Sequence, residues 1–146
     1  CPGQRCTLLR RAARDASPEV FAGPAAFSTR VQYLAAGRDG VYVVDGEDIL
    51  RIAPDGQVAK RVAGLGAQLM GLRVLDADDT LLVAGHADRA VYRVARDGSV
   101  EVLARSAPPW APSAALIARD GTLHVLEWSS QNVARVRHVE RAARSR

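Results

Sequence analysis

The chain has 146 residues, of which 48% are hydrophobic and 25% are charged, a balance typical of a globular domain and not of a disordered chain. Its net charge of +4 comes almost entirely from arginine, since Lys60 is the only lysine. The longest apolar runs are strand-sized, which excludes a membrane-spanning helix. The arginines are spread through the whole chain, which argues against a nucleic-acid partner.

The N-terminus carries the two cysteines, in the sequence Cys1-Pro-Gly-Gln-Arg-Cys6. No second cysteine pair or nearby histidine completes a zinc site. A disulfide between these cysteines would indicate an oxidising compartment, and a mature chain that starts with Cys resembles a bacterial lipoprotein after signal removal. We therefore expect an extracytoplasmic location, periplasmic or secreted. Whether the two cysteines are bonded stays open.

Residues 9–21 are the first predicted strands, because they align with residues 92–103 further along the chain. An Asp-Gly turn at 39–40 then precedes a strand at 41–44, and a strand at 49–52 leads into a second Asp-Gly turn at 55–56. The same signals recur as strands at 81–84, 91–94, 123–126 and 133–136. Asp-Gly between apolar runs favours a tight hairpin, because such turns need a positive φ. Each unit is therefore predicted to form four short antiparallel strands.

Several residue types recur at one spacing. Arg51, Arg93 and Arg135 follow one another at intervals of 42 residues, and Asp55-Gly56 and Asp97-Gly98 differ by the same interval. Four strands repeated at about 40–45 residues are typical of a β-propeller blade. Because the three arginines belong to the repeat, we expect them to have a structural role.

The repeat divides the chain into four segments: an N-terminal segment with the outer strands of a partial blade (1–38), a blade (39–70), a second blade (71–107), and a partial blade with a basic tail (108–146). The fourth strand of the last segment is in doubt, and the tail is equally compatible with a short helix. Closed propellers have roughly four to eight blades. We therefore expect an all-β, incomplete propeller that is a fragment of a larger ring or half of an oligomeric one, with stacked sheets as the alternative.

The third unit contains the clearest form of the repeat motif. It has Asp120-Gly121-Thr122-Leu123-His124-Val125-Leu126-Glu127, followed by Asn132-Val133-Ala134-Arg135-Val136. This pattern resembles NHL-type repeats and the six-bladed propellers of the SMP-30/gluconolactonase/strictosidine-synthase-like group. The lactonase branch implies a divalent cation held by Glu, Asn and Asp side chains in the central funnel. Asn132 is the only asparagine here, and no set of positions matches that metal shell. The resemblance therefore indicates the fold and not the chemistry.

In a propeller, both Asp-Gly turns of a blade lie on one face, so the other loops share the opposite face. We expect ligand-binding residues there: Asp45, His86, Trp110, Glu127 and Trp128. The carboxylates of Asp45 and Glu127 are candidate ligands for a hard cation, or else cap loops or pair with arginines. His86, beside Asp88, is a candidate base or metal ligand, or else a plain loop residue. The two tryptophans suit a pocket wall, a protein contact or blade packing.

The first functional hypothesis is a non-catalytic propeller segment that binds a protein or a small molecule through this loop face, with a second copy of the chain as a further candidate partner. The alternative is part of a metal-dependent, SMP-30/gluconolactonase-like hydrolase with a divalent cation such as Ca²⁺. No catalytic residue is assigned, because no nucleophile motif surrounds the serines at 129–130.

Overall fold

The computed structural model describes residues 6–28, 31–75 and 78–139, which form thirteen strands and one short 3₁₀ turn, η1 (Pro24–Ala26). The strands are β1 (Leu8–Arg10), β2 (Glu19–Ala22), β3 (Val31–Ala36), β4 (Val41–Asp45), β5 (Asp48–Ile52), β6 (Val58–Val62), β7 (Leu69–Val74), β8 (Leu81–Gly85), β9 (Ala90–Val94), β10 (Val100–Arg105), β11 (Trp110–Ile117), β12 (Leu123–Ser129) and β13 (Ala134–Val139). The predicted all-β class is confirmed.

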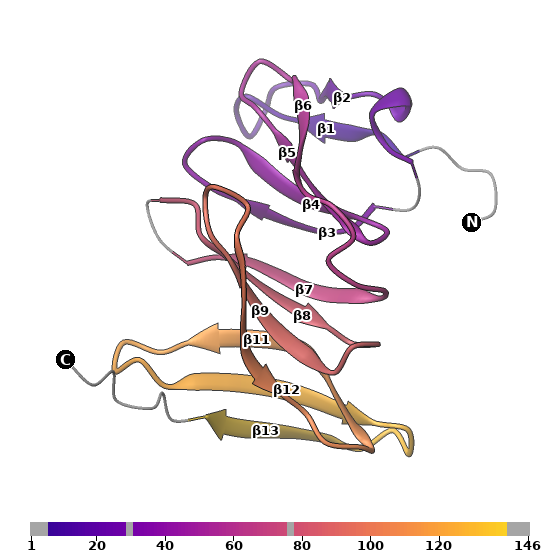
Figure 1. Ribbon diagram of the computed structural model, residues 1–146. Coiled ribbons are helices and arrows are strands. Elements are labelled where there is room, and N and C mark those ends of the chain that lie inside the picture. The colour runs from indigo at the N-terminus through magenta and orange to yellow at the C-terminus, as the bar shows by residue number, and fades with distance from the viewer. Residues whose placement is uncertain (1–5, 29–30, 76–77, 140–146) are drawn as a thin grey trace.

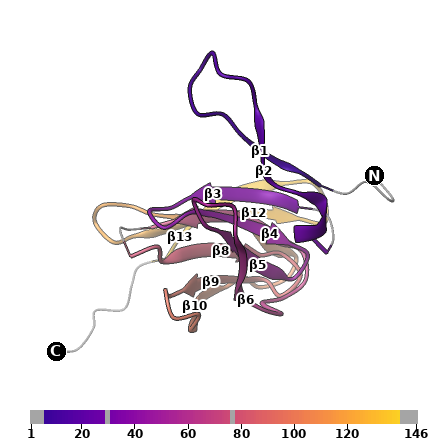
Figure 2. The same ribbon diagram turned by 90° about the horizontal axis from the view of Figure 1, so that it is seen from above.

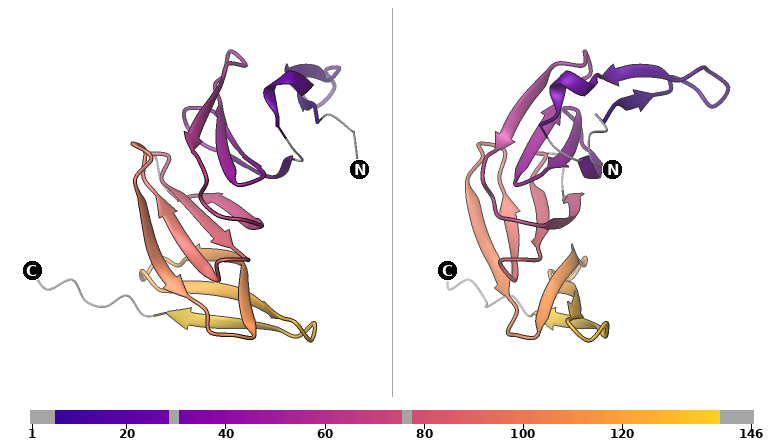
Figure 3. Two further views of the ribbon diagram at one scale, coloured as in Figure 1. Left: turned by 45° about the vertical axis from the view of Figure 1, so that its right-hand side comes forward. Right: turned by 90° about the vertical axis from the view of Figure 1, so that its right-hand side faces the viewer.

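The strands form four antiparallel sheets, each made of strands that are consecutive in sequence. We call β1–β2 the N-terminal hairpin, β3–β6 blade 1, β7–β10 blade 2 and β11–β13 blade 3. The sheets follow one another in chain order along a curved stack, with the hairpin and blade 3 at its two ends (Figures 1 and 3). Seen from above, the hairpin loop projects out of the stack (Figure 2).

The sheets and the predicted segments overlap without coinciding. Residue 39 falls in the turn after β3, residue 71 lies inside β7, and residue 108 lies just before β11. The part of the last segment where a fourth strand or a short helix is left open, together with the basic tail, falls on residues 140–146, outside the described residues. Cys1 also lies outside them, so whether it is bonded to Cys6 stays open.

Three Asp-Gly turns have the geometry that the sequence predicts. Their glycines have positive φ angles of 86°, 86° and 87° at Gly56, Gly98 and Gly121. In each turn the aspartate side chain also accepts a hydrogen bond from the backbone N–H two residues ahead, over 2.9–3.0 Å. This bond satisfies a turn donor locally. The repeat therefore specifies backbone conformation through chemistry within a few residues.

Three apolar clusters form the core, and each lies between successive sheets. The first joins the hairpin to blade 1, through Ala22 and Val43. The second joins blade 1 to blade 2, through Tyr42 and Leu81. The third joins blade 2 to blade 3 and includes Leu82, Val91, Leu123 and Val125. Strands β4 and β8 are buried on both faces, which explains their continuous apolar sequences.

The N-terminal hairpin takes the position of a blade's outer strands. A Cβ at Gly56 would lie 2.8 Å from the carbonyl oxygen of Phe21 in β2, and a Cβ at Gly98 would lie 3.1 Å from that of Arg61 in β6. The β5–β6 turn thus packs on the hairpin as the β9–β10 turn packs on β6. Arg10 adds a hydrogen bond from Nη1 to the carbonyl oxygen of Pro54, over 2.7 Å. The alignment of residues 9–21 with a later hairpin is therefore reflected in the packing.

No helix within the described ranges has the length and hydropathy needed to cross a membrane.

Candidate functional site

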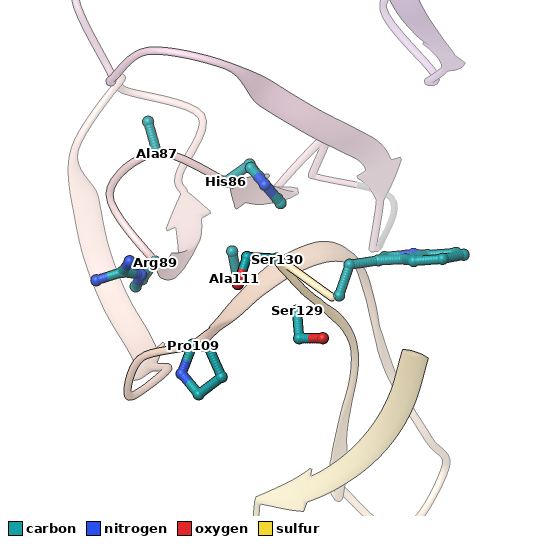
Figure 4. Close-up of a pocket in the computed structure, with 8 residues that line it drawn as sticks. His86, Ala87, Arg89, Pro109, Ala111, Ser129 and Ser130 are labelled. Carbon is teal, nitrogen blue, oxygen red and sulfur yellow. The ribbon is translucent and has the colours of Figure 1, made fainter. Parts of the chain in front are cut away.

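A cavity of about 240 Å³ lies where the β8–β9 turn of blade 2 faces the β12–β13 end of blade 3 (Figure 4). It is lined by His86, Ala87, Arg89, Pro109, Ala111, Trp128, Ser129 and Ser130. Two of the five predicted site residues, His86 and Trp128, thus meet in one place. The other three, Asp45, Trp110 and Glu127, are not part of this lining.

His86 has an imidazole nitrogen without a partner. Its Nδ1 is buried and has no hydrogen bond within the part of the chain that the structure describes. The backbone fixes the residue, because its N–H donates to the carbonyl oxygen of Gln68 over 3.0 Å and its own carbonyl accepts from Arg89 N–H over 3.3 Å. A buried polar atom without a partner costs free energy.

Asp88, the expected neighbour of His86, has a different partner. Its Oδ2 accepts a hydrogen bond from the hydroxyl of Tyr92 over 3.0 Å. The same carboxylate lies against Gly66, where a Cβ would come within van der Waals overlap of Oδ2. Burial, and then the bond to Asp88, raises the pKa of Tyr92 above its ordinary value. Asp88 therefore bonds within blade 2, to Tyr92, and lies against the loop that enters the blade.

On the blade 3 side, the cavity is formed by the β12–β13 turn and by the exposed indole ring of Trp128. The Oγ of Ser129 accepts from the backbone N–H groups of Gln131 and Val133, each over 3.3 Å, so this hydroxyl shapes the β12–β13 turn. Trp128 is 42% exposed, and Ser130 is exposed beside it. An exposed indole next to polar hydroxyls offers both stacking area and hydrogen-bonding groups to a ligand.

Glu127 is buried in an ion-pair cluster. Its side chain is fully buried, and its Oε2 lies 2.7 Å from Nε of Arg135 while its Oε1 lies 2.9 Å from Nε of Arg137. The hydroxyl of Ser106 also donates to Oε1. Burial alone would raise the pKa of Glu127, but the hydrogen bonds from Ser106 and the two arginines outweigh it and lower the pKa. Both carboxylate oxygens thus have protein donors.

Trp110 is tied to the same cluster. The guanidinium of Arg135 stacks over its ring at 4.0 Å from the centroid, while Nε of the same arginine bonds Glu127. Cation–π stacking of this kind suits a partly buried Arg–Trp pair. Of the uses predicted for Trp110, this contact matches packing within the fold.

Asp45, the last residue of β4, is hydrogen-bonded to the segment that precedes β3. Its Oδ2 accepts from both the backbone N–H and the hydroxyl of Ser28, over 2.7 and 2.9 Å. Within residues 6–28, 31–75 and 78–139, no group of three or more His, Cys, Asp and Glu side chains is arranged to hold a metal ion. The metal role predicted for Asp45 and Glu127 therefore stays a prediction.

Strand pairing corrects one expected equivalence. In the sequence, Asp45, Gly85 and Glu127 each directly follow the second strand of their unit (41–44, 81–84 and 123–126), which predicts equivalent places for the three residues. In the structure Val31 pairs with Asp45, Leu69 with Gly85, and Trp110 with Ser129. The residue that corresponds to Asp45 is therefore Ser129, because β12 has seven residues where β4 and β8 have five. The sequence also gave no signal for Ser106, which reaches Glu127 from the end of blade 2.

The repeated arginines have the structural role that we predicted for them where their contacts are clear. Arg51 donates from Nε and Nη2 to the carbonyl oxygen of Asp39, over 3.0 and 2.6 Å. Arg135 pairs with Glu127 as described above. Neither arginine lines the cavity.

No protein-family model matches the chain, and no curated protein matches it either. Solved structures do. Virginiamycin B lyase from Staphylococcus aureus is 13% identical with a TM-score of 0.63, over 92% of this chain and 49% of the lyase. A catalytically inactive histidine-to-alanine variant of that lyase, with quinupristin, is 14% identical with a TM-score of 0.60, over 85% and 46%. A gluconolactonase from Xanthomonas campestris is 16% identical with a TM-score of 0.67, over 92% and 53%.

These likenesses establish the fold class. The chain is an all-β, incomplete β-propeller, as predicted, and its neighbours include a propeller of the gluconolactonase type that the sequence resembles. The chain spans about half the length of these structures. At identities of 13–16%, the likeness concerns the fold alone and assigns no chemistry to the cavity.

Proposed function

We propose that this chain is a propeller segment that binds a small molecule or a partner's side chain in the cavity between blades 2 and 3, without catalysing a reaction. The observation that carries the proposal is that His86, whose buried Nδ1 has no hydrogen bond among the described residues, lines the same cavity as the exposed ring of Trp128. By contrast, the carboxylates of Asp45 and Glu127 already accept hydrogen bonds from the protein.

The size and lining of the cavity suggest the class of ligand. A dry cavity of about 150 Å³ holds benzene, so 240 Å³ suits one ring with a small polar substituent. Arg89 supplies a positive charge, and Ser130 supplies a hydroxyl at the rim. The best-matched ligand is therefore an aromatic ring with an anionic or hydrogen-bonding group.

The test uses two probes of similar size, benzoate and benzyl alcohol, with nuclear magnetic resonance signals of His86 and Trp128 as the readout. The proposal predicts that benzoate shifts both signals saturably and binds more tightly than benzyl alcohol. Trp128→Ala should weaken benzoate binding about tenfold, since one aromatic contact contributes roughly 0.5–1.5 kcal/mol beyond its area. Leu9→Ala, at a somewhat more exposed site on the hairpin, is the control and should change nothing. Absence of saturable shifts would refute the proposal.

A second candidate function is part of a propeller enzyme. Two of the structural neighbours are named as a lyase and a gluconolactonase, and a histidine-to-alanine variant of the lyase is named as catalytically inactive. A histidine in a cavity is suited to acid–base chemistry near neutral pH. In that case the chain should hydrolyse gluconolactone above the spontaneous rate when a divalent cation is present, and His86→Ala should abolish the excess. Benzoate binding without such turnover would favour the binding module.

A further inference from the structure

Blade 3 has one covered face and one uncovered face. Leu123 and Val125 of β12 pack toward blade 2, so the alternation along the strand directs Leu126 to the opposite side. Strand pairing places Val136 on that same side opposite Leu126, and Leu116 opposite the outward residue at position 124. Leu116 is 41% exposed and Val136 is 56% exposed. This outward face carries a hollow of about 250 Å³ with a mainly apolar lining.

The face of blade 1 that packs against the N-terminal hairpin is only partly covered. Leu34 of β3 pairs with Val43 of β4, so both side chains lie on that face. The N-terminal hairpin buries Val43 completely, but Leu34 remains 58% exposed. The hairpin thus covers the outer part of this face and leaves its inner part, at the first strand, open.

The two uncovered faces belong to one repeating series of contacts. The first strand of each blade packs against the first strand of the next, β3 against β7 and β7 against β11. At the second of these junctions, a Cβ on Gly71 of β7 would lie 2.7 Å from the carbonyl oxygen of Ser113 in β11. The outward face of β11 is therefore of the kind that receives a following blade, and the open face of β3 is of the kind that packs on a preceding one.

We propose that these faces bind each other between two copies of the chain, so that blade 3 of each copy packs on β3 of the other and two arcs close one ring. The length fits, because one chain spans 49% and 53% of the lyase and gluconolactonase propellers. A two-fold axis makes both junctions identical. Blade 3 already has three strands, and the N-terminal hairpin occupies the place of a blade's third and fourth strands, so ring closure requires the hairpin to move outward by one strand and to pair along β13.

The test is the mass of the full chain by light scattering on a size-exclusion column. The proposal predicts twice the chain mass of 15.6 kDa. Leu116→Asp and Leu34→Asp each place a charge in both junctions and should weaken association at least about 100-fold, which gives monomers. Val102→Asp is the matched control, since Val102 is 43% exposed on β10, away from both faces, and should leave the dimer intact.

Mixing the two interface variants separates this arrangement from any other. A dimer of Leu34→Asp with Leu116→Asp has one junction free of both charges, so the mixture should contain more dimer than either variant alone. Circular dichroism confirms that each variant is folded, and Leu34→Ser and Leu116→Ser replace any that is not. A monomeric wild-type chain would overturn the proposal. So would a Leu34 variant that stays dimeric while the Leu116 variant dissociates, because that result indicates pairing of blade 3 with itself.

Discussion

Replacing Glu127 by glutamine tests the ion-pair cluster that joins blades 2 and 3. Glutamine keeps the shape of the side chain but removes the charge that accepts hydrogen bonds from Arg135 and Arg137, over 2.7 and 2.9 Å. A hydrogen bond to a charged group contributes about 1.5–3 kcal/mol, and a neutral one about half of that. The arginines are 40% and 28% exposed and can turn to water, so we expect a net loss of about 2 kcal/mol in the free energy of unfolding.

Urea denaturation at a series of pH values provides the assay. The pKa of Glu127 is lowered in the folded state, so its stabilisation is present above the unfolded pKa of about 4.3 and is lost as the pH falls through the folded pKa. The stability difference between wild type and Glu127→Gln should be constant from pH 7 to about 5 and should shrink in more acidic solution. Glu19→Gln is the control, because Glu19 and its partner Arg10 are both about half exposed, and it should cost under about 0.5 kcal/mol. A Glu127→Gln variant as stable as wild type, or a difference that widens in acid, would refute the reasoning.

Three further predictions use the same assay. Tyr42→Phe should lower the free energy of unfolding by about 1–2 kcal/mol, because the Tyr42 hydroxyl donates over 3.0 Å to the buried Asp79. Tyr92→Phe should lower it less, because its partner Asp88 is exposed. Equal losses for the two variants would contradict this reasoning. Gly71→Ala should lower the free energy of unfolding by about 2–4 kcal/mol, because φ is +76° and a Cβ would meet the backbone of β11. Gly64→Ala, where φ is +59° and a Cβ would meet open space, should lower it by about 1 kcal/mol. Ca²⁺ at 1 mM should leave the midpoint of urea unfolding unchanged. A site with a Kd of about 10 µM would instead add about 2.7 kcal/mol to the free energy of unfolding, and that result would favour the hydrolase alternative.

The sequence predicted the features that depend on residues close together in the chain. The Asp-Gly turns at 56, 98 and 121 need a positive φ and a short polar side chain, and both requirements are visible in the sequence. The 42-residue spacing of the arginines marks one register in two blades, since Arg51 pairs with Tyr42 and Arg93 with Leu82, the second residues of β4 and β8. In blade 3, Arg135 pairs with the fifth residue of β12 instead. These features concern the fold, which explains why the all-β propeller was predictable.

The candidate site was less predictable, because it depends on contacts between repeats. A carboxylate on the loop face has the same appearance in the sequence whether it faces a ligand or, like Glu127, is enclosed by donors from both blades. The seven-residue strand β12 shifted the last equivalence by two positions, to Ser129. The meeting of His86 with Trp128 across a blade junction likewise follows from how two sheets pack, which no single repeat specifies.

The central claim is that each repeat pairs with itself to form one blade, and backbone nuclear Overhauser effects test it most directly. The account predicts cross-strand signals between Tyr42 and Arg51 in blade 1, Leu82 and Arg93 in blade 2, and Glu127 and Arg135 in blade 3. Cross-strand backbone signals that join strands of different repeats, such as β4 with β8, would contradict the propeller arrangement and favour a fold of stacked, interleaved sheets.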